Sequence, residues 1–245
     1  MKNFSIILST VAVILAAVAI ISTCKCKTGA ETSAVSAEQI AATLKQNPQL
    51  IGEAMQAYEQ FQREEAEKAA QAMLQAHAAE LNSSEGLPFV GPKDAKVTVV
   101  EFFDFSCGYC KRLAPSVEKI VADNADVKVI FKPLSFVSKV SGYQAKAGLA
   151  VNKQGKFMEF YKQVMSYNSG PMTEEAVDGI AQSVGVDMEK YKKDLASAEV
   201  SKSLENVSNL ARAIQVNGVP MVFVNVKHVP AMSPEPIQEA INAAK

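Results

Sequence analysis

The sequence predicts an α/β fold with an inserted helical domain, preceded by an α-helical N-terminal segment. A strand–helix–strand pattern spans residues 96–131, a helical stretch covers about residues 138–217, and an Ala-, Gln- and Glu-rich region precedes both. The chain has 245 residues, of which 48% are hydrophobic. That length is sufficient for one domain with an appendage or for two small domains.

The charge balance excludes one broad class of function. The chain carries 25 Lys and Arg against 26 Asp and Glu, which gives a net charge of −1. A nucleic-acid-binding protein usually shows a strong basic excess. We therefore expect no nucleic-acid partner.

The N-terminus reads as a secretory signal. Lys2 precedes an uncharged, apolar run over residues 5–22, and Thr28-Gly29-Ala30 offers a small-x-small cleavage site. We expect residues 1–30 to be a signal peptide and the protein to be exported to the periplasm. The alternative is a retained membrane anchor through residues 5–22, which lies at the lower limit of length for a spanning helix.

Two of the four cysteines, Cys24 and Cys26, directly follow the apolar run. The stretch that ends at Cys24 resembles a bacterial lipoprotein acceptor site, although Thr23 departs from the small residue that is usual there. A lipidated Cys24 is thus a second route to membrane tethering. If the signal is cleaved after Ala30, only Cys107 and Cys110 remain, and they can pair only with each other, a partner or a substrate.

Residues 31–85 are predicted to form a helical segment. Ser36 and Gln39 fit a capping box that opens a short helix. Asn47-Pro48 then reads as the start of a second helix that extends toward Leu81.

The second helix carries two apolar stripes, separated by charged residues and alanines. The stripes are Ile51, Met55, Tyr58 and Phe61, then Met73, Leu74, His77 and Leu81. A narrow stripe on a long solvated helix needs a partner, so it either folds back on its own domain or packs against other copies. The length and the polar flanks favour self-association, and we expect a homodimer or homotrimer.

The main domain is predicted to span residues 86–245. A linker over residues 82–88 precedes a β-branched and aromatic strand at 96–103. Apolar residues at helical spacing follow over residues 108–123, and alternating apolar residues then indicate a strand near 127–131. Cys107 and Cys110 therefore lie where a buried strand turns into a helix.

The rest of this domain is predicted to be a helical insertion, followed by a β-hairpin and a C-terminal helix. Residues 138–217 are helical in character, with a turn near residues 168–171. A third strand spans Val219–Asn225, residues 226–230 complete a hairpin, and Pro234–Ala244 is the last helix.

The C-x-x-C pair has three possible uses. A zinc site or an iron–sulfur cluster needs about four ligands, and the chain offers only His77 and His228 besides this pair. As a structural crosslink the pair is poor, because a disulfide that closes so short a loop removes little chain entropy. Redox chemistry is therefore the favoured interpretation, with no metal and no cofactor other than a Cys107–Cys110 disulfide.

The residues around the pair fit redox chemistry. Cys107 falls at the start of a helix, where free N–H groups and the helix dipole stabilise a thiolate. Cys110 is one turn further on. Glu101 interrupts an apolar strand, which predicts either a buried carboxylate with a function or an edge-strand residue that faces solvent. Pro115 lies inside the helix, where it removes a backbone hydrogen bond.

Together these motifs resemble the thioredoxin fold. They are an acid six residues before C-x-x-C, a proline five residues after it, and a distant strand that opens on Val219-Pro220. The long helical stretch before that strand is similar to the insertion of the DsbA family of bacterial thiol-disulfide oxidoreductases. The resemblance covers about residues 86–245.

The resemblance implies a role for each matching residue. Cys107 would be the nucleophile and Cys110 the resolving cysteine. Pro220 would be a cis proline that faces the pair, and Val219 would offer backbone groups to an extended substrate. Glu101 would be the buried acid that moves protons to and from Cys110.

Two features depart from the best-known DsbA pattern. Gly108 and Tyr109 stand between the cysteines, where a pair with histidine is usual, and this dipeptide resembles the isomerase DsbC. Both residues would border the bound substrate. The N-terminal helical segment resembles the oligomerisation segments of ScsC-like proteins. Both departures favour isomerase or reductase activity.

The resemblance also implies partners. Clients would be exported cysteine-containing proteins, and a membrane protein of the DsbD-like reductant or DsbB-like oxidant kind would reset the pair. One alternative is a protein that acts mainly as a DsbA-type dithiol oxidase. An alternative of another class is a surface structural or host-interaction protein that retains the fold.

Overall fold

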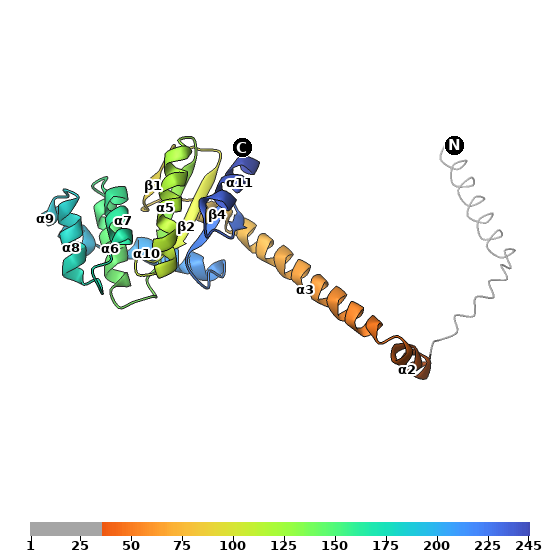
Figure 1. Ribbon diagram of the computed structural model, residues 1–245. Coiled ribbons are helices and arrows are strands. Elements are labelled where there is room, and N and C mark those ends of the chain that lie inside the picture. The colour runs from red at the N-terminus through yellow and green to blue at the C-terminus, as the bar shows by residue number, and fades with distance from the viewer. Residues whose placement is uncertain (1–35) are drawn as a thin grey trace, which may run out of the picture. The chain divides into compact units, whose positions relative to one another are not determined.

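The computed structural model describes residues 36–245, in which a five-stranded sheet has the order β1-β3-β2-β4-β5 (Figure 1). The two central strands β2 and β3 are parallel, and the other neighbours are antiparallel. The strands are β1 (Phe89–Val90), β2 (Thr98–Phe103), β3 (Lys128–Pro133), β4 (Met221–Val224) and β5 (Lys227–Val229).

Most of the elements expected from the sequence are present. Helix α5 and helix α11 have the predicted bounds, whereas the short edge strand β1 was not predicted. The helices are α2 (Ala37–Gln46), α3 (Gln49–Ala76), α4 (Ala78–Leu81), α5 (Gly108–Asp123), α6 (Ser141–Asn152), α7 (Phe157–Ser166), α8 (Glu174–Ser183), α9 (Met188–Leu195), α10 (Ala198–Ala213) and α11 (Pro234–Ala244).

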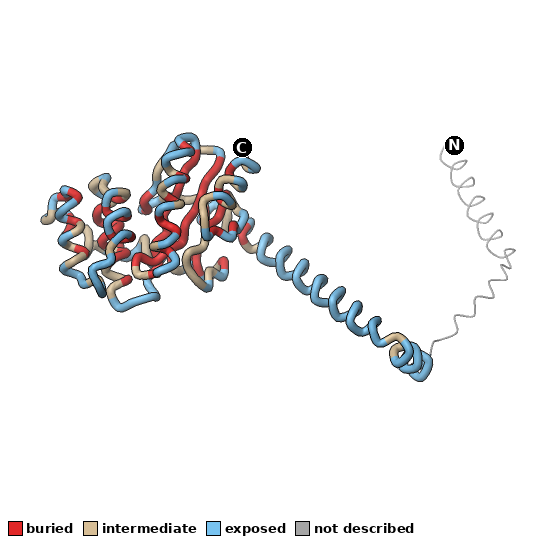
Figure 2. The backbone as a smooth tube through the Cα atoms, in the orientation of Figure 1, coloured by how far each residue is buried: buried red, intermediate tan, exposed pale blue. Residues whose placement is uncertain are grey.

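Strand β2 is the centre of the domain, and every residue in it is buried (Figure 2). Val99 and Phe103 pack with α5, α7 and α11 on one face of the sheet. Val100 and Phe102 pack with α10 on the other face. A strand covered on both faces reads as a continuous apolar run, which is the pattern that predicted it.

The helices α6 to α10 lie between β3 and β4, in the range predicted as the insertion. Helices α6, α7, α8 and α9 pack mainly with one another, with α6 in contact with the other three, and join the core on the α5 side of the sheet. Helix α10 falls in the same range but packs directly on the opposite face, through Val200, Val207 and Leu210. The helices between these two strands therefore contribute to both faces of the sheet.

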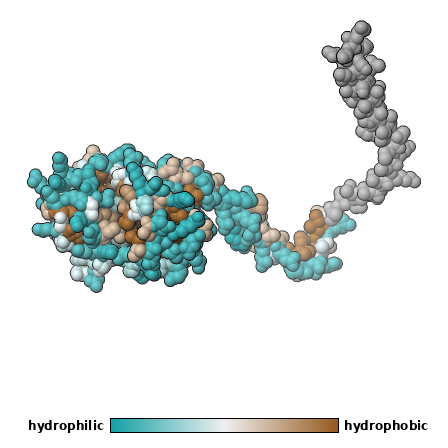
Figure 3. Space-filling view, turned by 90° about the horizontal axis from the view of Figure 1, so that it is seen from above, coloured by the Kyte–Doolittle hydropathy of each residue, from teal (hydrophilic) through white to brown (hydrophobic). Residues whose placement is uncertain are grey.

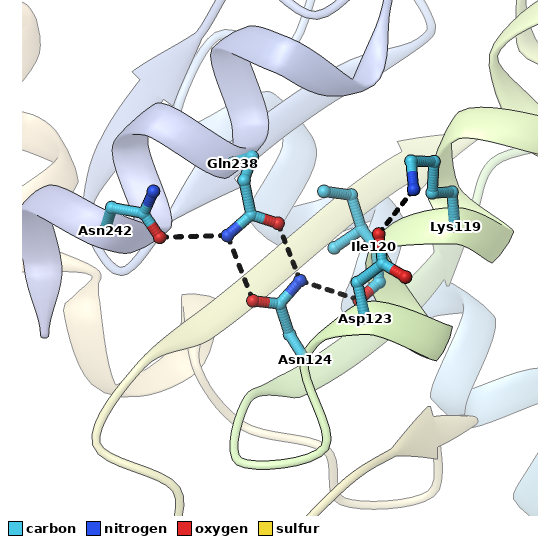
Figure 4. A network of polar contacts seen from close by, with 6 residues as sticks. All are labelled: Lys119, Ile120, Asp123, Asn124, Gln238 and Asn242. Carbon is cyan, nitrogen blue, oxygen red and sulfur yellow. Dashed lines mark hydrogen bonds and ion pairs between the residues drawn. The ribbon is translucent and has the colours of Figure 1, made fainter.

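The C-terminal end of α5 is fastened to α11 (Figure 4). The amides of Asn124 and Gln238 exchange two hydrogen bonds, of 2.8 and 3.1 Å. Asn124 Nδ2 also donates to the carbonyl of Ile120, and Gln238 Nε2 donates to Asn242 Oδ1. Because Asn124 is buried, this network satisfies polar groups that water cannot reach, and it holds the end of α5 that lies away from the cysteines.

The N-terminal helices confirm part of the prediction and correct another part. The Ser36–Gln39 capping box is present. Helix α3 ends at Ala76, short of the predicted Leu81, because the backbone of His77 (φ −105°, ψ 15°) leaves the helical region before α4 begins. His77 lies 3.4 Å from Glu80 Oε1, as a surface or packing residue would.

The two predicted stripes have different outcomes. The first is exposed, with Met55 at 59% and Tyr58 at 63% exposure. The surface of the N-terminal helical segment is mostly hydrophilic, with hydrophobic residues gathered near α2 (Figure 3). In the second, Leu74 and Leu81 are buried in the core on the α10 side of the sheet. The second stripe therefore folds back on its own domain, whereas the described residues leave the first stripe uncovered. The chain divides into compact units within α3, at Gln60 and Phe61.

The segment predicted as a linker is held by two buried lysines of β3. Lys132 Nζ donates to the carbonyls of Glu80 and Ser83, and Lys128 Nζ donates to those of Asn82 and Lys93. Burial, followed by the nearby charge of Lys128, lowers the pKa of Lys132 to about 8. These donors satisfy carbonyls at the end of α4 that have no helical partner.

The predicted signal peptide, the membrane anchor over residues 5–22 and the lipidation site at Cys24 all lie outside the described residues. Among the helices of residues 36–245, none combines the length and apolarity needed to cross a membrane.

Replacing Leu81 tests whether the second stripe belongs to the core of the sheet domain. Leu81→Ala should lower the free energy of unfolding by about 2–4 kcal/mol, because Leu81 has 0% exposure and its removal leaves a cavity. The measurement is a urea titration in which unfolding is monitored through hydrogen exchange of the β2 and β3 amides. Leu50→Ala removes the same atoms from an exposed side chain and should leave this transition nearly unchanged. Equal effects of the two substitutions would contradict the assignment.

Candidate active site

Cys107 lies between the end of β2 and the start of α5. It is the N-cap residue of α5, with an extended backbone (φ −75°, ψ 121°), and its side chain is 7% exposed. Its amide donates to the carbonyl of Asp104 at 2.9 Å, which closes a tight loop after the strand. The thiol therefore sits at the first turn of a helix, close to the surface.

The loop before β4 brings a distant part of the chain to this thiol. The Val219–Pro220 peptide bond is cis, as predicted. β4 pairs with β2 so that Met221 lies opposite Phe102, which places the loop beside the end of β2. Cys107 Sγ lies 3.4 Å from the carbonyl oxygen of Val219, 112 residues away. The predicted pairing of Cys107 with the Val219–Pro220 loop is therefore present.

Cys110 lies one helical turn further along α5 and has 0% exposure. Cys107 and Cys110 are both free thiols in this structure. Burial raises the pKa of the Cys110 thiol, and interactions with Cys107 and Glu101 raise it further. The two sulfurs thus differ, one near the surface and one enclosed.

Glu101 lies in the middle of β2 and is fully buried, which confirms the buried interpretation and excludes the edge-strand one. The hydroxyl of Tyr161 on α7 donates to its carboxylate, 3.2 Å from Oε2 and 3.4 Å from Oε1. Burial raises the pKa of Glu101 to about 8, although the hydrogen bond from Tyr161 acts in the opposite direction. A carboxyl group that titrates near neutral pH can both donate and accept a proton.

A second buried acid, Asp104, was not singled out from the sequence. Its Oδ1 accepts from the Ser106 amide and from Ser141 Oγ, both at 2.8 Å. Its Oδ2 accepts from the amides of Phe136 and Val137 at 3.0 Å. Three of these hydrogen bonds join the loop before Cys107 to residues 136–141, at the start of α6 and just before it. The position of Asp104 directly after an apolar strand and two residues before Ser106 is typical of a local turn, which was the available signal.

Gly108 and Tyr109, between the cysteines, are exposed at the first turn of α5. The guanidinium of Arg112 lies over the Tyr109 ring, 4.1 Å from its centroid. This cation–π contact orients the aromatic ring next to the reactive thiol. Gly108 has no side chain to cover the sulfur of Cys107.

Within residues 36–245, no group of three or more His, Cys, Asp and Glu side chains is placed to hold a metal ion. What the site offers is a dithiol in unequal environments, a buried carboxyl group with a pKa of about 8, and a partly exposed residue, Val219, beside the thiol of Cys107. Such an arrangement can form, break and transfer disulfide bonds.

This fold and site define the thiol-disulfide oxidoreductases of the thioredoxin fold. A family model described as "DSBA-like thioredoxin domain" matches residues 98–242, more than half of the chain. The chain belongs to this DsbA-like family.

Two curated proteins are similar to more than half of the chain. The chain is 32% identical over 148 residues to "Probable disulfide bond formation protein D" of Bacillus cereus, covering 56% of this chain and 68% of that protein. A match to the Na(+)/H(+) antiporter NhaA 1 of Salinispora arenicola, 27% identical, covers 63% of this chain and spans only 24% of the antiporter's length.

Two solved structures extend the similarity to the N-terminal helices. BcfH of Salmonella enterica Typhimurium is 28% identical, with a TM-score of 0.69. ScsC of Proteus mirabilis, in a transitional conformation, is 25% identical, with a TM-score of 0.63. Each match covers 84% of this chain and 93% of the other.

Replacing Glu101 tests whether the pKa of its carboxyl group is raised in the folded protein. The folded pKa of about 8 lies above the ordinary 4.5, so the folded state holds a proton that the unfolded state releases between these values. The wild type should lose stability as the pH rises from 4.5 to 8, and Glu101→Gln should not. We expect the two reduced proteins to be similar near pH 4.5, and the variant to be more stable by roughly 3–5 kcal/mol above pH 8.

The measurement is urea unfolding of both proteins, with reductant present, at several pH values from 4.5 to 9. Glu118→Gln, on the partly exposed surface of α5, is the control and should follow the wild type. A stability difference that does not change with pH would contradict the raised pKa of Glu101.

Proposed function

We propose that this protein exchanges disulfides with exported, cysteine-containing proteins in the periplasm, with Cys107 as the nucleophile and Cys110 as the resolving cysteine. The observation that carries the proposal is the inequality of the two thiols. Cys107 lies near the surface beside the backbone of Val219, and Cys110 is enclosed beneath it. A client thiolate can reach the first sulfur and not the second.

In the oxidising direction, a client thiolate attacks the sulfur of Cys107 in the Cys107–Cys110 disulfide. The bond between the two enzyme sulfurs breaks, and Cys110 leaves with the electron pair and takes up a proton. A second client thiolate then attacks the client sulfur of the mixed disulfide and releases Cys107. Two electrons pass from the client to the enzyme, and the client gains a disulfide.

Glu101 is proposed to supply and recover the proton of Cys110. Because the pKa of the Cys110 thiol is raised, its thiolate is a poor leaving group. The disulfide therefore breaks more easily when a proton is transferred to the Cys110 sulfur. With a pKa of about 8, most Glu101 carboxyls carry a proton at pH 7. Tyr161, which donates to this carboxylate, would act as a positioning residue.

Val219, Pro220, Gly108 and Tyr109 are proposed to border the bound client. The amide and carbonyl groups beside the cis bond are partly exposed, and an extended client segment can pair with such groups. The exposed Tyr109 ring offers apolar contact area beside the same sulfur.

We further propose that isomerisation is a main activity. The reduced Cys107 would attack a wrong client disulfide, hold the client while it rearranges, and leave without net transfer of electrons. The exposed stripe of the N-terminal helices would join two or three copies, so that several sites surround one misfolded client. Such an assembly would favour a DsbD-like reductant and hinder docking on a DsbB-like oxidant.

A dithiol oxidase is the second candidate function. It is favoured by the similarity of the sheet domain to a disulfide bond formation protein. The same residues would serve in both cases, and the redox potential and the membrane partner would decide between them.

Substituting each cysteine tests the assigned roles. Cys107→Ser should abolish both the reduction of insulin and the refolding of scrambled ribonuclease, because the attacking sulfur is lost. Cys110→Ser should still attack but fail to release the client, so a mixed disulfide should accumulate on non-reducing gels. Activity of Cys107→Ser in both assays would contradict the proposal. A redox titration of the wild type that shows no reversible two-electron couple would instead favour a fold retained for a structural or host-interaction role.

The stripe can be tested without removing core residues. Deleting residues 31–85 would remove the buried Leu74 and Leu81, so point substitutions are preferable. Met55→Asp/Tyr58→Asp should give monomers by light scattering and lose most ribonuclease refolding, while insulin reduction stays within about twofold of the wild type. Gln49→Asp/Gln56→Asp places the same charges on another face of α3 and should keep the oligomer. Full isomerase activity in a proven monomer would refute the oligomer argument.

A further inference from the structure

A cavity of about 390 Å³ opens between the first turns of α5 and the chain around α6, lined by residues that flank Cys107 in the sequence and not by Cys107 itself. Its wall includes Ser106, which directly precedes Cys107, and Lys111, whose amide donates to the Cys107 carbonyl at 3.0 Å. The opposite wall is formed by residues 138–140 and by the turn at residues 170–172. A client held on Cys107 would therefore lie at the edge of this cavity.

The charges that line the cavity are all positive. Lys111 and Lys139 line it, and no Asp or Glu does. Lys111 Nζ is half-buried and donates to the carbonyl of Tyr167 at 3.0 Å, which leaves further N–H groups. Among the described residues, neither lysine forms an ion pair. Of the acids close along the chain, Asp104 is buried and accepts four hydrogen bonds from other groups, and Glu174 and Glu175 lie in the first turn of α8, outside the lining.

The floor of the cavity is a fixed set of neutral polar groups. Ser106 Oγ donates to Gln144 Oε1 at 2.7 Å and lies 2.8 Å from Ser138 Oγ. Gln144 is 1% exposed, and its Nε2 donates to the sulfur of Met172 at 3.0 Å. A thioether is a weak acceptor, so this buried amide retains donor capacity for a stronger one.

We propose that this cavity is a subsite for the carboxylate of an Asp or Glu side chain in the client, close in sequence to the cysteine that reacts with Cys107. The proposal rests on the disulfide exchange proposed above. Lys111 and Lys139 would supply the charge and Gln144 a neutral donor. Because an extended chain spans about 3.3–3.6 Å per residue, the acid lies within two or three residues of the cysteine.

The half-buried position of Lys111 agrees with this role. Burial lowers the pKa of its ammonium group, which means that the site as it stands disfavours the charge. A bound carboxylate would favour that charge. The subsite would thus select among clients and leave the chemistry at the sulfur unchanged.

The test uses two-cysteine peptides, acetylated and amidated at their ends, with Asp or Asn at each of three positions on either side of the first cysteine. The oxidised full-length protein accepts two electrons from each peptide, and acid quenching with mass spectrometry gives the rate of peptide oxidation. We expect at least one Asp peptide to react about two- to fivefold faster than its Asn partner at low salt. That ratio should fall toward one in 1 M KCl.

Substitutions of lysines test whether the faster reaction of the Asp peptide depends on the charges that line the cavity. Lys111→Gln/Lys139→Gln should bring the Asp-to-Asn ratio close to one while the Asn peptide keeps its wild-type rate. Lys119→Gln/Lys162→Gln removes two exposed charges elsewhere and should preserve the ratio. A ratio near one in the wild type, or a ratio that survives Lys111→Gln/Lys139→Gln, would overturn the subsite. Failure of the wild type to oxidise any peptide would instead count against the proposed function.

Discussion

The burial of β2 on both faces is the constraint on which the site depends. A strand that no water reaches must satisfy every polar group within the protein, and this strand and the residue after it carry two carboxyl groups. The two carboxyl groups differ in the number of hydrogen bonds that they accept. Asp104 accepts four hydrogen bonds, from three backbone amides and the Ser141 hydroxyl, whereas Glu101 has one hydrogen-bond partner among the described residues, the Tyr161 hydroxyl. The first acid holds the loop in place, and the second keeps a proton near neutral pH.

The four bonds of Asp104 also explain how the helical insertion takes part in the site. Two of its donors, Phe136 and Val137, lie just before α6, and Ser141 is the first residue of that helix. The loop that presents Cys107 is thus held by the chain that enters the insertion. Tyr161 on α7 makes a second connection of the same kind, to Glu101. The insertion supplies groups that a bare sheet with α5 and α11 would lack, at both carboxylates.

Much of the fold and site could be predicted from the sequence, because their signals are local. Three local patterns each predicted one element. They are the apolar run of β2, the helical spacing after Cys107 and the Val219-Pro220 pair. The unpredicted features all depend on long-range contacts. Asp104 is one polar residue after a strand, and nothing nearby shows that residues 136–141 supply its donors. Lys128 and Lys132 lie near the two ends of β3, where charged residues usually face solvent, yet they are buried against carbonyls more than 30 residues away.

Those two lysines also explain why similar stripes on α3 and α4 have different fates. An apolar stripe on a helix can pack against any apolar surface of suitable shape. The composition of the stripe therefore does not predict which surface covers it. Leu74 and Leu81 meet the core on the α10 side of the sheet, and Lys132 fastens the turn that follows them. Met55 and Tyr58 precede the part of the chain so held and find no comparable cover among the described residues. Position relative to the segment that Lys132 holds, and not the composition of the stripe, therefore decides which apolar residues of α3 and α4 are buried by the sheet domain.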